Sequence, residues 1–235
     1  MLCQPRFWRL VALALFSSLP VRAQAASVVI TASFGGGNAV VSVRSILELK
    51  YRTVVKQQQD FSCGSAAIAT LLSYHYETPV PEREVLLAMY EKGNRAVIHR
   101  EGFSLLDMKQ YLDGRGLQAD GIYAGLDDLE RVGVPAIVLI EDQGYRHFVV
   151  VKGVKNGEVL VGDPAVGLRV YRRAHFETLW TNRLLFVVRS HADVARKHFN
   201  TAPQWAAIAR APLGVAVSRD SLANVTLLRP PSGDF

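Results

Sequence analysis

Cys63 is the first candidate catalytic residue of this 235-residue chain, because it carries a thiol and follows a polar segment. The other cysteine, Cys3, lies in an N-terminal stretch typical of an export signal, so an exported mature chain would carry a single thiol. A lone thiol in an oxidising compartment is either deeply buried or kept for its reactivity. The cysteine count alone leaves both interpretations open.

The sequence following Cys63 predicts a helix to about Tyr76, with Ser62 placed to cap its first turn. A cysteine thiol beside a histidine at a helix N-terminus can have a pKa of about 3.5 to 7.5, instead of about 8.5. Free backbone N–H groups there also favour an oxyanion, and Gly64 would let a substrate approach them closely. Alternatively, Cys63 is a small apolar residue of a buried helix.

Residues 57–62 favour the reactive interpretation because they are too polar for a simple core segment. Gln57 precedes Cys63 by a short loop, so its side-chain amide could donate a hydrogen bond to an oxyanion. A glutamine at this spacing is a candidate part of an oxyanion hole.

His147 is the candidate base, because it lies between the polar turn 143–146 and the apolar strand 148–151. A residue at the start of a buried strand is held rigidly, and we expect this one to lie at the edge of a cleft. His75 is three turns along the predicted helix, too far from Cys63 to be its base. We interpret it as a packing or surface residue, together with His99, His175, His191 and His198.

Asp163 is the candidate partner of this histidine. The Asn156-Gly157 pair predicts a tight antiparallel hairpin, and Pro164 ends its second strand immediately after Asp163. A carboxylate there would lie near the imidazole and could fix its tautomer. Alternatively, Asp163 caps the turn 165–167.

Together these residues resemble the bacteriocin-processing, double-glycine-cleaving cysteine peptidases, a papain-like family. The resemblance covers roughly residues 54–188 and rests on Gln57, Cys63-Gly64, His147 and Asp163-Pro164. It implies that Cys63 is the nucleophile, that Gln57 contributes to the oxyanion hole, and that Asp163 orients His147. It implies peptide-bond hydrolysis without a metal or organic cofactor.

The chain departs from many of these relatives because it has a signal and lacks both membrane spans and a nucleotide-binding half. Its layout is similar to the exported protease-like component of bacterial functional-amyloid secretion systems. That resemblance implies a peptide or protein substrate, with a glycine-rich sequence as one option, and secretion or amyloid components as partners. Two alternatives remain: a non-hydrolytic module that holds a glycine-rich peptide, and acyl-transfer or cell-wall amidase chemistry on a related fold.

The pattern divides the chain into a signal (1–25), a strand-like extension (26–50), a peptidase domain (51–189) and a C-terminal appendage or tail (190–235). Within the domain, sequence patterns predict helices first and strands second, which favours an α+β fold. The predicted helices cover about 63–76, 82–91, 104–113 and 127–131, and the predicted strands cover 135–140, 148–154, 158–161, 168–171 and 184–188. A Ser104–Asp107 capping box begins the third helix.

The N-terminus has the order of a secretory signal: basic residues, the apolar stretch 10–19, then Ala23-Gln24-Ala25. The apolar stretch is short for a membrane span, although a retained anchor or a buried helix is the alternative. We therefore expect export, to the periplasm. Gly35, Gly36 and Gly37 are interpreted first as a flexible hinge, with self-processing as the alternative.

The charge distribution argues against nucleic-acid binding, and the cysteine count argues against metal sites built from paired cysteines. Half of the net charge of +6 comes from three arginines of the signal, and no basic run remains that would bind nucleic acid. Metal motifs built from paired cysteines are excluded by the cysteine count.

Overall fold

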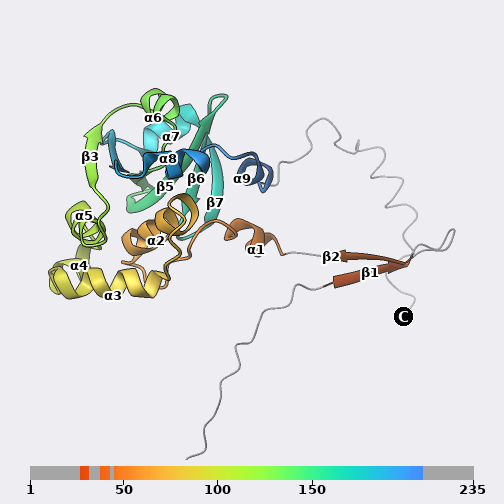
Figure 1. Cartoon of the computed structure of the whole chain (residues 1–235), viewed down its shortest axis with the longest axis horizontal. Helices are drawn as coiled ribbons and strands as arrows, with labels where there is room; N and C mark the ends of the chain where they lie inside the picture. Colours follow the sequence, from red (N-terminus) through yellow and green to blue (C-terminus); the bar gives the residue numbers. More distant parts are fainter. Residues whose placement is uncertain (1–26, 32–37, 43–44, 209–235) are drawn as a thin grey trace, which may run out of the picture. The chain divides into compact units, whose positions relative to one another are not determined.

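The computed structural model describes residues 27–31, 38–42 and 45–208, which belong to two separate units (Figure 1). The first unit holds the antiparallel strands β1 (Ser27–Thr31) and β2 (Asn38–Ser42). The second unit begins at Ser45. The predicted signal and the glycine run 35–37 lie outside the described residues.

The predicted extension 26–50 also contains a helix, α1 (Ile46–Lys50), which belongs to the second unit. Ser45 caps α1, because its Oγ accepts a hydrogen bond from the Glu48 N–H at 3.0 Å. Close approach of Lys50 to Gly167 joins this helix to the sheet, since a Cβ on Gly167 would lie 2.8 Å from the Lys50 carbonyl oxygen. The last five residues of the predicted extension are therefore part of the second unit.

After α1, the first half of the second unit continues with four helices: α2 (Cys63–His75), α3 (Glu82–Lys92), α4 (Arg95–Glu101) and α5 (Leu105–Asp113). Helix α2 is buried along most of its length and lies against α3 on one side and β5 on the other (Figure 1). The predicted capping box is present: Ser104 Oγ accepts from the Asp107 N–H, and Asp107 accepts from the Ser104 N–H. None of the helices within the described ranges is long and apolar enough to span a membrane.

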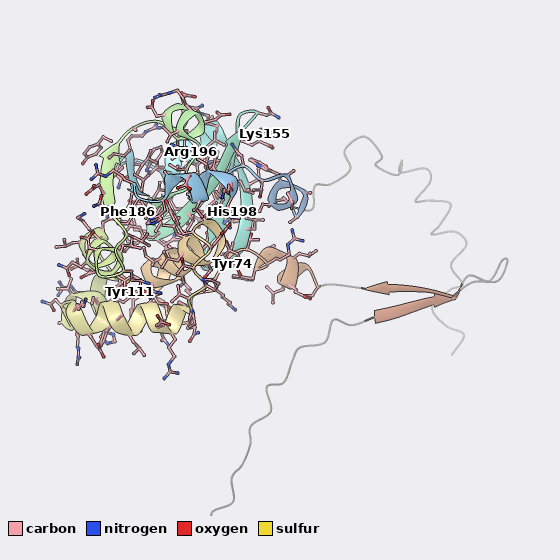
Figure 2. The ribbon with its side chains drawn as sticks, viewed as in Figure 1. Tyr74, Tyr111, Lys155, Phe186, Arg196 and His198 are labelled. Atoms are coloured by element: carbon pink, nitrogen blue, oxygen red, sulfur yellow. The ribbon has the colours of Figure 1, made fainter. Side chains whose placement is uncertain are left out.

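A six-stranded sheet forms the second half, in the order β3-β8-β4-β5-β6-β7 with neighbours antiparallel. Its strands are β3 (Ala119–Tyr123), β4 (Ala136–Asp142), β5 (Tyr145–Lys155), β6 (Glu158–Asp163), β7 (Gly167–Arg172) and β8 (Leu184–Val188). Apolar side chains of α2 and the sheet share one core, to which Phe186 of β8 belongs (Figure 2). The α+β class predicted from the sequence is confirmed.

Two tight hairpins set the register around the candidate site. Asn156 and Gly157 both have positive φ, as a type I′ turn requires, and join β5 to β6 as predicted. Gln143 and Gly144 also have positive φ and join β4 to β5, pairing Asp142 with Tyr145. Strand β5 therefore begins at Tyr145, three residues earlier than predicted.

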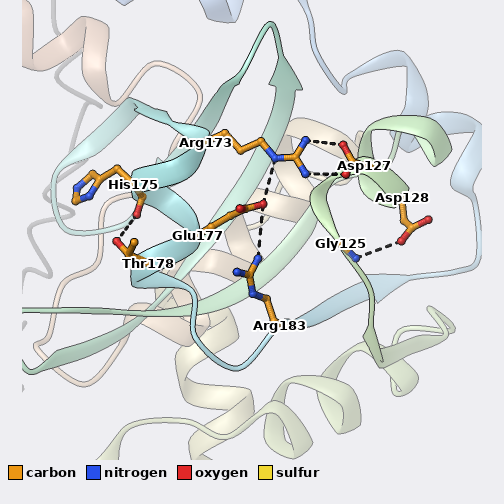
Figure 3. A network of polar contacts seen from close by, with 8 residues as sticks. All are labelled: Gly125, Asp127, Asp128, Arg173, His175, Glu177, Thr178 and Arg183. Carbon is orange, nitrogen blue, oxygen red and sulfur yellow. Dashed lines mark hydrogen bonds and ion pairs between the residues drawn. The ribbon is translucent and has the colours of Figure 1, made fainter.

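Two further helices lie beside the sheet, α6 (Leu126–Val132), which the sequence predicts, and α7 (Arg173–Leu179), which it does not. The guanidinium of Arg173 ties them together (Figure 3). It donates to both carboxylate oxygens of Asp127 on α6, at 2.8 Å for Nη2–Oδ2, and to Glu177 of its own helix at 3.1 Å.

The start of the predicted C-terminal appendage packs against the second unit. It contains α8 (Ala192–Lys197) and α9 (Ala202–Ala206), which includes Trp205. Phe199 is buried in the core, and the Asn200 side-chain amide donates to the Val154 carbonyl of β5 at 2.8 Å. Residues 209–235 lie outside the described part of the chain.

Lys152 is a buried charged residue in the apolar strand β5. It is 0 % exposed, its ammonium group donates to the Thr53 carbonyl, and it lies 5.2 Å from the centre of the Tyr74 ring. Its partners are thus a carbonyl group and a ring rather than a carboxylate. Burial lowers the pKa of Lys152 to about 7.

Replacing Lys152 with methionine is expected to stabilise the fold by about 1 to 4 kcal/mol at pH 6, because an apolar chain of similar length replaces a buried charge. The folded pKa of about 7 lies below the unfolded value of about 10.4. The cost of burying this amine is therefore largest below pH 7 and disappears above the unfolded pKa.

Urea unfolding at pH 6 and pH 10 measures this difference. The increase in the free energy of unfolding caused by Lys152→Met should be much smaller at pH 10 than at pH 6. An equal increase at both pH values would contradict the proposed cost of burying the charged amine. Lys155→Met, at the exposed end of β5 (Figure 2), is the matched control. It should change the free energy of unfolding by no more than about 0.5 kcal/mol.

Candidate active site

Cys63 is the first residue of α2, as predicted, and only 7 % of it is exposed. The predicted side-chain cap is wrong, because Ser62 makes no capping hydrogen bond. Its hydroxyl instead accepts from the Gln59 N–H at 3.1 Å and donates to the Gln59 carbonyl at 3.0 Å. Ser62 therefore closes the turn that delivers Cys63 to the helix.

His147 and Asp163 come together across the neighbouring strands β5 and β6. His147 Nε2 lies 3.1 Å from Asp163 Oδ2, and both side chains are more than nine-tenths buried. The second carboxylate oxygen, Oδ1, accepts from the N–H groups of Ala165 at 2.8 Å and Val166 at 3.3 Å. Asp163 thus both pairs with His147 and caps the following turn, so the two interpretations of the sequence are compatible.

These hydrogen bonds also set the charge of Asp163. Burial alone would raise the pKa of its carboxyl group, but the hydrogen bond and charge of His147 and the two backbone N–H groups outweigh burial. The pKa of Asp163 therefore lies below its ordinary value. The carboxylate is ionised at neutral pH.

The other nitrogen of the imidazole is unengaged. His147 Nδ1 is buried and has no hydrogen-bond partner among the described residues. The Cys63 thiol lies beside the backbone of Phe148, the residue that follows His147. Burial raises the pKa of this thiol, Asp163 raises it further, and backbone hydrogen bonds from Phe148 and Gly64 oppose the rise. The thiol is therefore neutral at neutral pH, and a base-assisted nucleophile would need a free ring nitrogen such as Nδ1 to accept its proton.

Gln57 lies beside the turn that follows Asp163. Its backbone N–H donates to the Pro164 carbonyl at 3.0 Å, which joins its loop to the turn after Asp163. Its side-chain Nε2 donates to the Gln59 carbonyl at 3.2 Å, and its Oε1 is buried without a partner among the described residues. The Gln57 side chain also makes a hydrogen bond with Tyr145.

Gly64 lies where α2 comes close to its neighbours. A Cβ at this position would lie 2.7 Å from the Met108 side chain and 3.1 Å from Phe103. The position that a Cβ would occupy is therefore filled by these two residues. Glycine here allows α2 to approach α5 and the segment before it.

A cleft opens beside Cys63. Its volume is about 460 Å³, and its walls come from α4, the segment after it, and strands β4 and β5: Val97, Glu101, Gly102, Phe103, Ser104, Leu139, Arg146 and Phe148. A second cavity of about 270 Å³ lies between β3, β8, α6 and α8 and contains none of the candidate site residues. The first cleft is therefore the one that can hold a substrate against the thiol.

Other titratable groups lie elsewhere. His75 is fully buried in α2, and burial holds its pKa well below the ordinary value, with Lys152 and His198 adding to the effect. This agrees with its interpretation as a packing residue. Within the described ranges, no group of three or more His, Cys, Asp or Glu side chains could hold a metal ion.

Sequence reasoning missed Tyr145. Its ring stacks on the ring of His147, with centroids 5.1 Å apart and planes inclined by 29°. It was assigned to a polar turn, although an aromatic residue two positions before a histidine lies on the same face of a strand. The spacing of two residues between Tyr145 and His147 was therefore the sequence signal that could have predicted their contact.

Residues 51–192 match the Peptidase C39 family. The chain belongs to that family. It is therefore a cysteine peptidase, and the resemblance to double-glycine peptidases predicted from the sequence is confirmed.

Two similar relatives are both described as "Probable functional amyloid protease FapD". The one from Pseudomonas aeruginosa is 38 % identical over 180 residues, which cover 77 % of this chain and 79 % of the relative. The one from Pseudomonas fluorescens is 38 % identical over 164 residues, which cover 70 % of this chain and 72 % of the relative.

The fold matches a solved structure, the peptidase domain of Streptococcus ComA, described as a bi-functional ABC transporter. The TM-score is 0.50 at 23 % identity, over 58 % of this chain and 96 % of that domain. The papain-like peptidase fold predicted from the sequence is confirmed.

Proposed function

We propose that this chain is an exported endopeptidase that cleaves a secreted or fibre-forming protein next to small residues such as Gly-Gly, with Cys63 as nucleophile. The observation that carries the proposal is the buried His147–Asp163 pair, whose Nδ1 has no partner among the described residues, on the strand whose Phe148 backbone contacts the Cys63 thiol. Two relatives described as functional amyloid proteases support the class of substrate. The signal-like pattern of residues 1–25 supports export to the periplasm.

The reaction begins when the thiol proton moves to His147 Nδ1 and the sulfur attacks the peptide carbonyl carbon. The carbonyl oxygen becomes an oxyanion, which accepts hydrogen bonds from the Gln57 amide and from backbone N–H groups at the start of α2. Asp163 stays ionised, holds the N–H at Nε2, and stabilises the imidazolium. No metal or organic cofactor takes part in these steps.

The tetrahedral species then collapses. The carbon–nitrogen bond breaks, the proton on His147 Nδ1 passes to the leaving amine, and a thioester to Cys63 remains. Water enters, gives one proton to Nδ1 and attacks the thioester carbon. The carbon–sulfur bond breaks, the acid product leaves, and the proton on Nδ1 returns to the sulfur.

Burial of the thiol supports the preference for small residues. Cys63 is 7 % exposed, and Met108 and Phe103 occupy the space over the neighbouring Gly64. A scissile bond can reach the sulfur most easily when the residues beside it lack side chains. Glycine pairs meet this requirement best.

Three peptides that are identical except for Gly-Gly, Ala-Ala or Val-Val before the scissile bond test the proposal. Mass spectrometry should find cleavage by the wild type fastest after Gly-Gly and slowest after Val-Val, with none by Cys63→Ala. If wild type and Cys63→Ala bind the Gly-Gly peptide equally and leave it intact, a peptide-holding module is the better account. Equal cleavage of all three peptides would remove the small-residue preference alone.

A further inference from the structure

Tyr145 occupies the first position of β5, two residues before His147. Side chains alternate along a strand, so Tyr145 and His147 share one face while Arg146 and Phe148 share the other. Arg146 and Phe148 line the cleft beside Cys63. Tyr145 is therefore on the histidine side of the strand, outside the walls of that cleft.

The ring of Tyr145 covers the imidazole. The two ring centroids are 5.1 Å apart with an interplanar angle of 29°, which is a stacked geometry. His147 is 7 % exposed, whereas Tyr145 is 48 % exposed, so the tyrosine is the outer member of the pair. One face of the imidazole is thus shielded from water by a side chain that is itself at the surface.

The hydroxyl group of Tyr145 points to the loop before Cys63. Its Oη lies 3.5 Å from the Asp60 carbonyl oxygen. Burial raises the pKa of Tyr145 and the nearby Cys63 adds to this, while a hydrogen bond with the Gln57 side chain lowers it. The hydroxyl is therefore protonated at neutral pH and contacts the loop that carries Gln57.

We infer that Tyr145 is a positioning residue for the reaction. Its ring fixes the orientation of the His147 imidazole by stacking on it, and its hydroxyl group fixes the position of the loop that carries Gln57. This inference rests on the proposed roles of Cys63, His147 and Gln57. The terminal torsion of a histidine side chain has a broad energy minimum, so packing must fix the ring orientation. Asp163 fixes one edge of the ring, and Tyr145 fixes its face.

The two parts of the side chain have separable effects. Tyr145→Phe keeps the ring over His147 and removes the contact with the loop, whereas Tyr145→Ala removes both. Tyr123, an 81 % exposed tyrosine on the edge strand β3, is the matched control. Tyr123→Ala removes the same number of atoms as Tyr145→Ala, but on a strand that is separated from β5 by β8 and β4.

Two readouts separate ring from hydroxyl in the full-length protein. The first is the rate of Cys63 alkylation by iodoacetamide against pH, followed on the Cys63 peptide by mass spectrometry so that Cys3 does not interfere. The second is kcat and KM for a Gly-Gly peptide. Tyr145→Ala should shift the alkylation profile by about one pH unit toward alkaline pH, a roughly tenfold loss of rate on its acid side. Tyr145→Phe should leave that profile in place and lower kcat with little change in KM.

The outcomes are distinct. A Tyr145→Ala profile that superimposes on those of the wild type and Tyr123→Ala would overturn the role of the ring. Unchanged kcat in Tyr145→Phe would overturn the role of the hydroxyl group. If His147→Ala also alkylates like the wild type, the proposed catalytic pair fails rather than the role of Tyr145.

Discussion

Replacing His147 with alanine is expected to lower kcat/KM for peptide cleavage by about 10²- to 10⁴-fold, the range for loss of a general acid–base group. Burial raises the pKa of the Cys63 thiol, so without the imidazole the sulfur stays protonated at neutral pH. The leaving amine also loses its proton donor. Steady-state cleavage of a Gly-Gly peptide at pH 7 measures the loss.

His175→Ala is the control, because His175 lies on α7 and contacts Tyr171 rather than the candidate site. Its kcat/KM should stay within about threefold of the wild type, as for a surface substitution that shifts a free energy by no more than about 0.5 kcal/mol. Equal activity of His147→Ala and the wild type would remove His147 from the mechanism.

Replacing Asp163 with asparagine is expected to lower kcat by about 10²- to 10⁴-fold, because an amide carries only one acceptor oxygen. The aspartate uses two: Oδ2 faces His147, and Oδ1 accepts from the N–H groups of Ala165 and Val166. In either orientation of the amide, its NH₂ group meets a donor. If it faces His147, the imidazole proton moves to Nδ1 and that nitrogen can no longer accept the thiol proton.

The pH dependence of stability separates this effect from simple damage. The folded pKa of Asp163 is depressed, so the ionised carboxylate stabilises the fold above the unfolded pKa of about 3.9. That contribution is lost as pH falls through the folded value. The deficit of Asp163→Asn in urea unfolding should therefore shrink as the pH falls below about 3.9. A deficit that is independent of pH would contradict the assigned charge.

The candidate site residues could be proposed because local patterns and the family resemblance pointed to the same positions. Cys63 follows a polar loop and begins an alanine-rich helix, His147 begins an apolar strand, and Asp163 precedes a proline. The two-residue turn Asn156-Gly157 then fixes which strands are neighbours. Local sequence therefore determined both the elements and the pairing that brings His147 to Asp163.

Elements with weak local patterns were missed. Helix α4 (Arg95–Glu101) has seven residues, too few for a clear helical period, and its Asn94 cap is its main signal. Strand β3 (Ala119–Tyr123) contains Asp120 and Gly121, residues that are depleted in strands. Its pairing with β8 is what stabilises it, and that pairing depends on tertiary contacts.

The missed side-chain contacts have a similar cause. Ser62 looks like a helix cap, but the turn at Gln59 uses its hydroxyl. Lys152 lies within the predicted strand 148–154, and a register shift between Val151 and Gly153 leaves it at an irregular position of β5, with its amine on the Thr53 carbonyl. Such competition between hydrogen-bond partners is decided only after the chain has folded.

The most direct test of the central claim is a search for an acyl-enzyme on Cys63. The full-length protein is mixed with a Gly-Gly peptide ester, quenched in acid within the first turnover, and mapped by mass spectrometry. The account predicts that the Cys63 peptide gains the mass of the acyl group, that hydroxylamine removes it, and that Cys63→Ala shows no adduct. Continued cleavage by Cys63→Ala, or an adduct at another residue, would contradict Cys63 as the nucleophile.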